Sequence, residues 1–363
     1  MSRQTRIRVL LIAPSMKIVG GHSIQADRLL RAFAGDTQIE MRLRPIDPKL
    51  PLFIRSIPYI RTAVNAPVYY AGLVKDIAAA DVVHAFTSSF WGYTLWILPA
   101  VLLSRSFGRK IVVNYHDGRA EHHLRDWPSA TLTLRRADAI AVPSPYLVDV
   151  FAKFGFKAEA ISNAIDLQAF RYRERATVRP VFLTNRGMEE LYNVDCTLRA
   201  FRLVQDRYPA AQFVVGNDGP LRRELETLAR DLGLKNLTFT GAVSQSRMAE
   251  MYDQADIYVM SPRIDNMPLT VLECFASGVS VVSTDAGGVP YIAGHERNAL
   301  LVPCGSPEAL ANACFRLLEE PGLASSLTRE GYNDCVERYS VPSVREQWRG
   351  LYRRLLAIRA ESA

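Results

Sequence analysis

Two carboxylates eight residues apart, Asp265 and Glu273, bracket a segment suited to binding a phosphorylated sugar. Pro268 lies between them and fits the first position of a helix, where no amide hydrogen is needed. The free amides of Met267, Leu269 and Thr270 would then lie at the positive end of the helix dipole. Phosphate binds readily at such a helix end. Carboxylates repel an anion but accept hydrogen bonds from sugar and ribose hydroxyls. The pattern therefore predicts a nucleotide-sugar site.

The elements around this segment form a strand–helix–strand unit. Residues 257–260 and 279–283 are apolar, β-branched runs typical of buried parallel strands, and residues 269–276 read as the helix between them. Gly278 suits the end of that helix, because glycine enters the left-handed conformation at little cost. Gly287 and Gly288 form the next turn. We therefore expect this unit to organise a parallel sheet.

The order of carboxylate, seven residues, carboxylate, small-residue helix, Gly, strand and Gly-Gly resembles the donor-binding segment of family-4 retaining glycosyltransferases. The usual pair in that family is Glu and Glu, so Asp265 is one methylene shorter. The resemblance covers nearly the whole chain and is weakest between residues 45 and 80. It implies an α/β fold called GT-B, with two facing Rossmann-like domains, parallel sheets and a C-terminal helix that crosses back to the first domain.

The resemblance also implies how the domains divide the work. Residues 1–168 would form the acceptor-side domain, with residues 344–363 packing back on it, and residues 169–343 would bind the donor. Its catalytic residues would be His116 beside the reacting sugar, Asp265 on the sugar hydroxyls and Arg186 on the diphosphate. The remaining donor-binding residues would be Gly20, Gly21, Gly219, Val243, Met267, Leu269, Thr270 and Glu273.

Two histidines follow apolar runs in the first half of the chain. Residues 81–85 and Lys110–Tyr115 read as strands, the first ending at His84 and the second just before His116. Ligand sites in open α/β sheets lie beyond the carboxyl ends of strands, so both histidines are expected to point toward a cleft. The alternative is a structural histidine, above all for His84. His122 and His123 lie in a charged stretch and are expected to be solvated.

One departure from the family pattern concerns the diphosphate. A Lys-Gly normally follows the arginine, but here Tyr192 and Asn193 occupy that place. Arg186 is then the main cation on the leaving group, with Arg263 as a second candidate. No D-x-D sequence is present to hold a divalent ion at the diphosphate. We therefore predict a metal-independent enzyme without a cofactor, in which helix-end amides and Arg186 stabilise the leaving group.

Composition sets wider bounds. The chain has 363 residues, enough for two domains, and a net charge of +7 that suits an anionic substrate, a membrane surface or nucleic acid. No nucleic-acid-binding motif accompanies the charge. Five scattered cysteines indicate a reduced, cytoplasmic protein.

Residues 41–75 mix basic and apolar side chains. They fit either an interfacial segment that touches anionic lipid or an irregular loop and helix packed on the core. The second reading is preferred, because its prolines would break any long helix. Peripheral contact with the inner face of the membrane stays open.

The sequence thus predicts a retaining glycosyltransferase that moves a sugar from a nucleotide-diphosphate donor to a hydroxyl, with lipid-linked and polysaccharide acceptors among the alternatives. A nucleotide-sugar epimerase or a phosphorylase of the same fold is the first rival. A non-catalytic sugar-nucleotide-binding protein is the second, because of the missing lysine. The nucleobase, the sugar, the acceptor and the oligomeric state are left open.

Overall fold

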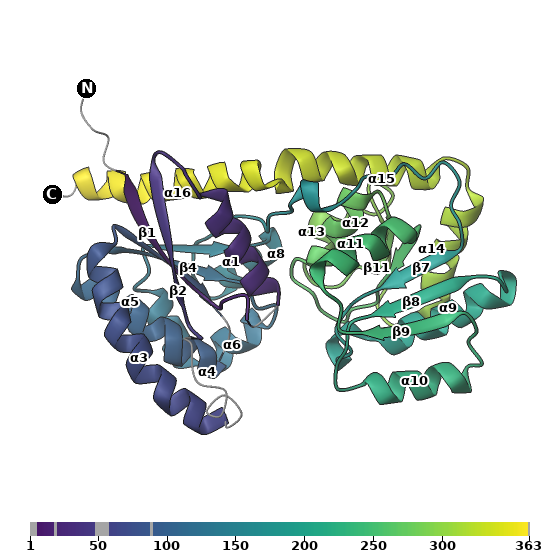
Figure 1. The fold of residues 1–363 in the computed structure, drawn as a ribbon, viewed down its shortest axis with the longest axis horizontal. Helices are drawn as coiled ribbons and strands as arrows, with labels where there is room; N and C mark the ends of the chain where they lie inside the picture. The colour runs from purple at the N-terminus through teal and green to yellow at the C-terminus, as the bar shows by residue number, and fades with distance from the viewer. Residues whose placement is uncertain (1–5, 18–19, 48–57, 88–89, 362–363) are drawn as a thin grey trace. The chain divides into compact units, whose positions relative to one another are not determined.

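The structure, a computed structural model, describes residues 6–17, 20–47, 58–87 and 90–361 (Figure 1). The chain divides into two compact units. Unit 1 contains Met1–Ala164 and Val341–Ala363, and unit 2 contains Ile165–Ser340. The divisions predicted from sequence, after residues 168 and 343, lie a few residues from these.

Unit 1 is built on a six-stranded parallel sheet with the order β2-β1-β3-β4-β5-β6. Its elements are β1 (Ile7–Ala13), α1 (Gly21–Ala32), β2 (Ile39–Pro45), α3 (Pro58–Ala79), β3 (Val82–Thr87), α4 (Phe90–Gly92), the π-helix η1 (Tyr93–Ile97), α5 (Leu98–Ser106), β4 (Lys110–Tyr115), α6 (Ala120–Asp126), α7 (Pro128–Leu134), β5 (Ala139–Val142), α8 (Pro145–Lys153), β6 (Ala158–Ala160) and α16 (Val341–Glu361). Two apolar clusters cover its faces, one with α1 and α16 and the other with α3, α5 and α8. Burial on both faces explains the continuous apolar strands.

The segment predicted to be an irregular loop and helix is more regular than expected. Residues Ile39–Pro45 form the edge strand β2, and Pro58–Ala79 form a single helix that continues through Pro67. An internal proline removes one helical hydrogen bond. Burial of Tyr69, Leu73 and Ile77 against the sheet outweighs that loss. The expectation that prolines would break this helix was therefore wrong.

The C-terminal helix α16 belongs to unit 1. Trp348, Leu351, Tyr352 and Leu355 are buried against the face that also carries α1, as their helical spacing predicts. The return of the last helix to the first domain is confirmed.

Unit 2 repeats the design with a parallel sheet of order β12-β11-β10-β7-β8-β9. Its elements are η2 (Leu167–Ala169), β7 (Val181–Thr184), η3 (Glu190–Tyr192), α9 (Val194–Arg207), β8 (Gln212–Gly216), α10 (Arg222–Asp231), β9 (Leu237–Gly241), α11 (Gln245–Gln254), β10 (Ile257–Val259), α12 (Leu269–Ser277), β11 (Ser280–Thr284), α13 (Val289–Ile292), β12 (Leu300–Val302), α14 (Pro307–Glu319), α15 (Leu323–Asp334) and the π-helix η4 (Cys335–Tyr339).

The organising helix α12 has the predicted ends, with one correction. Gly278 closes it with φ 67°, in the left-handed region as expected. Pro268 is the residue before the helix and not its first residue, because its ψ of 118° is extended. The first helical amide is therefore that of Leu269, and the predicted phosphate seat keeps its place at the start of α12.

Candidate functional site

Arg186 and Asp265 form the charged centre of unit 2. Arg186 follows β7, Asp265 precedes α12, and the guanidinium Nη2 donates to the carboxylate Oδ2. The two side chains are only 12% and 11% exposed. Burial disfavours the charged form of Arg186, but the Asp265 carboxylate raises its pKa above the usual value, so the guanidinium stays charged. Burial raises the pKa of the Asp265 carboxyl, and Arg186 offsets part of that effect.

Tyr192 supports the same guanidinium. Its ring centre lies 4.1 Å from the Arg186 guanidinium carbon, a cation–π contact. A Cβ on Gly187 would lie 3.2 Å from this ring, so the turn after β7 is closely packed against it. The Nε of Arg186 is buried and has no hydrogen-bond acceptor among the described residues. The residue in the place of the family's lysine therefore contacts the arginine itself.

Arg263 is tied to the turn that carries Tyr192. Its Nη2 donates to Asn193 Oδ1 at 3.3 Å, and its amide donates to the Leu191 carbonyl at 2.8 Å. Asn193 has the left-handed φ of 51°, and its carbonyl accepts from Ser261 Oγ at 2.6 Å. Arg263 is exposed. The structure therefore places the second candidate cation next to the turn that holds the first.

Glu273 lies at the end of a chain of hydrogen bonds that the sequence did not reveal. Tyr258 donates to Asn185 Oδ1 at 2.8 Å, the Asn185 amide donates to the Tyr252 hydroxyl at 2.7 Å, and Tyr252 donates to Glu273 Oε2 at 2.8 Å. Burial raises the pKa of Tyr252 well above its usual value, so the phenol keeps its proton. In the sequence, the only sign that Asn185 belongs to the site was its position directly before Arg186. The chain orients Glu273 on the inner side of α12.

Glycines bring the backbone close around Asp265 and Met188. A Cβ on Gly288 would lie 1.8 Å from the Asn266 carbonyl oxygen, and one on Gly287 2.4 Å from that of Asp265. The Gly288 amide donates to the Asp265 carbonyl at 2.7 Å. A Cβ on Gly219 would lie 2.6 Å from the Met188 carbonyl oxygen, so only glycine fits there. These contacts hold the loop after β11 against the loop after β10, and the loop after β8 against the loop after β7.

The N-terminus of α12 begins directly after this loop. Met267 is buried, while Leu269 and Thr270 are partly exposed and form the first turn. Pro268, the N-cap residue, makes no side-chain hydrogen bond to the first amides of the helix. The amides of a first helical turn have no partner within the helix, so this end attracts an anion.

Val243 lines a groove of about 860 Å³ along the sheet face beside α11. Thr238, Thr240 and Met251 line its middle, and Arg179 lies at the other end. Val243 thus borders a large hollow surface of unit 2 at the loop after β9, which is the place predicted for the nucleobase.

His116 follows β4 in unit 1 and keeps part of its surface exposed. Its ring stacks on Phe86 with centroids 4.9 Å apart, and His22 lies edge-on at 5.3 Å. Burial in this aromatic setting, and then the neighbouring His22 and His84, lower the pKa of His116 well below its usual value. The imidazole is therefore neutral at neutral pH.

Gly20 and Gly21 lie at the start of α1 in the same unit, and a Cβ on either would meet nothing within 4 Å. Among the residues that the structure describes, none packs so closely on this turn that it requires glycine.

His84 is not at a strand end, which corrects the sequence-based expectation. The strand β3 continues to Thr87, and His84 is buried within it. Because an amide nitrogen only donates, Nε2 of His84 accepts from Asn114 at 2.9 Å and its Nδ1–H donates to Tyr352 at 2.7 Å. Trp348 lies 4.2 Å away, ring centre to ring centre. His84 therefore fastens α16 to the sheet.

His123 also differs from the expectation. Its side chain is buried and its Nδ1 lies 2.8 Å from the Tyr115 hydroxyl, whereas a solvated residue was predicted. The helix α6 turns His123 inward and leaves His122 exposed. The helical spacing that would have placed His123 on the buried side of α6 was hard to see in the sequence, because charged residues flank both histidines.

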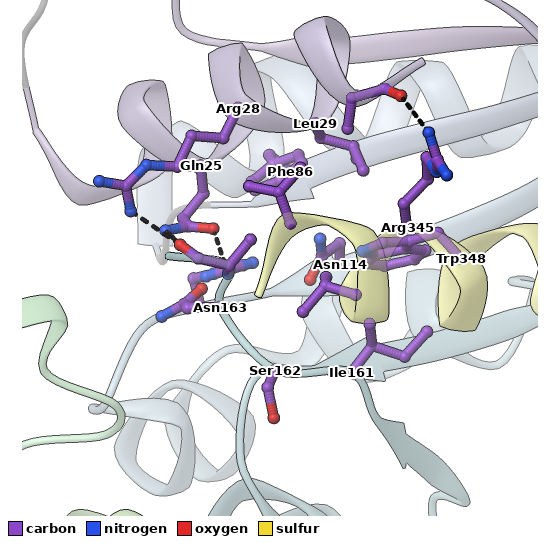
Figure 2. Close-up of a pocket in the computed structure, with 15 residues that line it drawn as sticks. Gln25, Arg28, Leu29, Phe86, Asn114, Ile161, Ser162, Asn163, Arg345 and Trp348 are labelled. Atoms are coloured by element: carbon purple, nitrogen blue, oxygen red, sulfur yellow. Dashed lines mark hydrogen bonds between the residues drawn. The ribbon is translucent and has the colours of Figure 1, made fainter. Parts of the chain in front are cut away.

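A small cavity of about 20 Å³, room for about one water molecule, lies between α1, α16 and the end of β6 (Figure 2). His116 and Asn114 border it. As the dashed lines in Figure 2 show, Gln25 and Arg28 of α1 hold the Ala164 peptide: Gln25 Nε2 and Arg28 Nη1 donate to its carbonyl at 2.9 and 2.7 Å. The cavity is too small for a sugar and is a packing feature of unit 1.

Among the described residues, no group of three or more His, Cys, Asp or Glu side chains could hold a metal ion. None of the helices in the described ranges is long and apolar enough to cross a membrane. All five cysteines are free thiols.

Comparison with known proteins shows matches to two protein-family models. The model of "Glycosyltransferase Family 4" matches residues 20–169, and that of "Glycosyl transferases group 1" matches residues 170–334. A relative is the alpha-D-kanosaminyltransferase of Streptomyces kanamyceticus, 25% identical over 281 residues, which cover 70% of this chain and 73% of that protein.

Solved structures show the same fold. Sucrose-phosphate synthase from Thermosynechococcus elongatus superposes with a TM-score of 0.76 at 20% identity, covering 97% of this chain and 100% of the other. Anabaena HepE, solved with UDP-glucose, gives 0.73 at 16% identity, covering 94% and 98%. The resemblance predicted from the Asp265 to Gly288 segment is confirmed. The chain belongs to family 4 of the glycosyltransferases and has the GT-B fold of enzymes that use nucleotide-sugars.

Proposed function

We propose that this glycosyltransferase transfers a sugar from a nucleotide-diphosphate donor to a hydroxyl, with retention of anomeric configuration and without a metal ion. The observation that carries the proposal is the charged Arg186, paired in a largely buried position with Asp265, which stands just before the N-terminus of α12. This combination offers a fixed cation and helix-end amides to one anion.

The leaving diphosphate would be stabilised by these groups. Charge develops on its oxygens as the sugar bond breaks, and donors that are already in place cost no reorganisation at that moment. Arg186 has a buried Nε without an acceptor among the described residues, and a phosphate oxygen would supply one. The amides of Leu269 and Thr270 would bind the same group. Arg263 is the second cation in reach of the Tyr192 turn.

The carboxylates would position the donor. Asp265, held by Arg186, would accept hydrogen bonds from the sugar hydroxyls, and Glu273, held by Tyr252, those of the ribose. The nucleobase would lie at Val243, and Gly219 would allow the loop after β8 to approach the ligand.

In unit 1, His116 would contact the sugar near the reacting carbon. Its lowered pKa keeps the ring neutral, so it can donate or accept a hydrogen bond without adding charge. Gly20 and Gly21 would cover the diphosphate.

A donor screen is the direct test. UDP-, GDP- and ADP-sugars are mixed with the protein, UDP-glucose first because HepE was solved with it. A true donor raises the melting temperature by mass action. Transfer to sugar and lipid acceptors is then followed in EDTA, and proton NMR of the anomeric position in the product reads retention or inversion.

Different outcomes of this screen would contradict the transfer reaction and its independence of metal ions. Donor turnover without any acceptor would favour an epimerase, and a requirement for phosphate would favour a phosphorylase. Tight donor binding with no transfer would indicate a binding protein. Activity lost in EDTA and restored by Mg²⁺ or Mn²⁺ would contradict the metal-free mechanism.

We also propose peripheral contact of residues 42–61 with the anionic inner face of a membrane, where a lipid-linked acceptor would be met. Residues 48–57 lie outside the described part of the chain. Arg42 is exposed and pairs with Glu40 two residues away, so its guanidinium lies at the surface. Arg44 instead pairs with Asp76 at 3.2 Å and occupies the space beside Gly72, so its role is structural.

A further inference from the structure

Unit 1 carries an exposed aromatic cluster just beyond the sheet end that bears His116. Trp91 of α4 is 69% exposed, the highest value among the large apolar side chains of the described residues. Its ring meets that of Trp127 edge-on, with centroids 5.4 Å apart and planes at 84°. Phe90 meets Trp127 in the same way at 5.7 Å. We call Phe90, Trp91 and Trp127 the aromatic platform.

Contacts within unit 1 support the platform. The indole Nε1 of Trp127 donates to Thr94 Oγ1 at 2.9 Å. Phe90 has a φ of 58°, a left-handed conformation that is a genuine outlier for a bulky residue. Such backbone strain clusters at ligand clamps and active sites. A single exposed tryptophan needs no explanation, but Trp91 packs on Trp127 and directly follows a strained residue, Phe90, and this combination indicates a use.

Polar groups join the platform to His116. Asp117 follows His116 directly, and its carboxylate accepts from Arg119 Nε at 3.2 Å and Nη2 at 3.0 Å. The Arg119 guanidinium carbon lies 5.3 Å from the Phe90 ring centre. Phe90 and Trp91 of the platform follow β3 and the Asp117–Arg119 pair follows β4, and Thr87 and Tyr115 of these strands are register partners. Aromatic faces and planar hydrogen-bonding groups therefore lie at the same end of the sheet, beyond the carboxyl ends of β3 and β4.

We propose that this surface binds the acceptor, and that the acceptor presents a sugar ring there. A pyranose has an apolar C–H face that fits an indole and a rim of hydroxyls that fits a carboxylate–guanidinium pair. The proposal rests on the proposed function, because transfer requires a hydroxyl acceptor near His116. It names the class of that acceptor, a neutral glycoside or glycan.

A membrane surface is the competing use of exposed tryptophan. The charges around the platform argue against it. Asp117 pairs with Arg119, Glu121 with Lys153 and Asp126 with Arg125, so these charges balance and no net positive field faces outward. An anionic bilayer is attracted by an excess of basic residues, which these pairs do not provide, whereas a neutral polyol donates hydrogen bonds to carboxylates and accepts them from guanidinium groups.

The test measures sugar binding by titration calorimetry, because Trp91→Ala removes a tryptophan of the platform and would change a fluorescence signal whether or not binding changed. The full chain is titrated with neutral di- and trisaccharides of glucose, galactose, mannose and N-acetylglucosamine, and separately with phosphatidylglycerol vesicles. The variants are Trp91→Ala, Trp91→Tyr and the control Leu132→Ala, which removes another exposed apolar side chain, 54% exposed, from α7.

We expect at least one saccharide to bind wild type and Leu132→Ala equally, to weaken about tenfold or more in Trp91→Ala, and to recover in part in Trp91→Tyr. Equal binding to all variants, binding of none of the saccharides, or a response to vesicles alone would overturn the proposal. Thermal stabilisation by the nucleotide-sugar is measured on the same samples. Its absence in wild type would count against the proposed function, whereas its presence in Trp91→Ala shows that only the acceptor side has changed.

Discussion

The Arg186 guanidinium lies 4.1 Å above the ring of Tyr192, the residue that stands where the family pattern has a lysine. The tyrosine therefore adds no charge to the site. It buttresses the arginine from one side while Asp265 binds it from another. A guanidinium binds two phosphate oxygens with two parallel N–H groups, so it must be oriented toward them before the phosphate arrives. A site with one arginine held in that orientation therefore differs from a site with two loosely placed cations.

This arrangement predicts that Tyr192 acts through Arg186. Tyr192→Leu should weaken donor binding by about 0.5–2 kcal/mol, the range of a cation–π contact, while Tyr192→Phe should keep most of it. Arg186→Ala should slow transfer by about 10²–10³, as removal of one charge-stabilising donor does elsewhere. Arg186→Lys should also fail, because an ammonium cannot copy the fork. Transfer rate, donor affinity and melting temperature are measured for each variant.

Tyr192→Lys is the complementary variant. It restores the charge of the family pattern but removes the ring beneath Arg186, so we expect no gain in transfer. Faster transfer with unchanged melting temperature would show that the tyrosine merely fills the place of a phosphate ligand. Wild-type transfer by Arg186→Ala would remove this arginine from the site altogether.

A second prediction concerns Glu273. Glu273→Gln should weaken donor binding by about 1.5–3 kcal/mol, the loss expected for a hydrogen bond to a charged group. Tyr252→Phe removes the donor that orients Glu273 and should lose a smaller part, about 1 kcal/mol. Titration calorimetry with the nucleotide-sugar measures both. Unchanged affinity in Glu273→Gln would contradict the ribose role.

The sequence predicted most of what depends on local pattern. Four largely apolar runs were predicted as strands with the bounds that the structure has: Ile7–Ala13, Lys110–Tyr115, Val181–Thr184 and Gln212–Gly216. Gly278 needed only the rule that glycine ends helices. The predictions that were wrong concern positions whose structure depends on tertiary packing. His84 interrupts an apolar run, so the strand seemed to end there, but Tyr352 and Asn114 satisfy its ring.

The hydrogen-bond chain to Glu273 could not be predicted for a related reason. Tyr252 is 21 positions before Glu273 and 67 after Asn185, and nothing in the local sequence links them. The pairing of Arg186 with Asp265, 79 positions apart, was equally hidden, although each residue had been assigned to the site separately.

The membrane hypothesis is tested with a variant that spares the fold. Arg42, Lys49, Arg55 and Arg61 are changed to Ala, and Arg44 is left because it pairs with Asp76. Each basic residue near an anionic surface contributes about 1 kcal/mol, so co-sedimentation with phosphatidylglycerol vesicles should fall strongly at low salt. Binding of wild type should fade with ionic strength. The control changes four exposed arginines elsewhere to Ala: Arg223, Arg230, Arg247 and Arg329. Equal sedimentation of both variants would reject the segment.

The last prediction concerns the pH dependence of stability, and it follows from His84. Burial lowers the pKa of His84 to about 3, and that of His123 to about 4, whereas an unfolded histidine titrates near 6.5. Both groups therefore favour the folded state above the unfolded pKa. As the pH falls below 6.5 the unfolded chain binds protons that the folded chain does not, and stability is lost by about 1.4 kcal/mol per pH unit for each histidine.

The window between pH 6.5 and about 4.5 reports on the histidines whose pKa values are lowered, which include His116 and His22 beside His84 and His123, because the carboxylates of Asp36, Asp81 and Asp256 have lowered pKa values and act at lower pH. Urea unfolding followed by tryptophan fluorescence, which reports on unit 1, is compared at pH 7.5 and pH 5.0. His84→Gln should be less stable at pH 7.5, since it loses the hydrogen bonds to Tyr352 and Asn114, yet its stability should fall less between the two pH values. His122→Gln, at an exposed position on α6, should behave as wild type. If His84→Gln kept the full pH dependence, the buried neutral state of His84 would be excluded as its source.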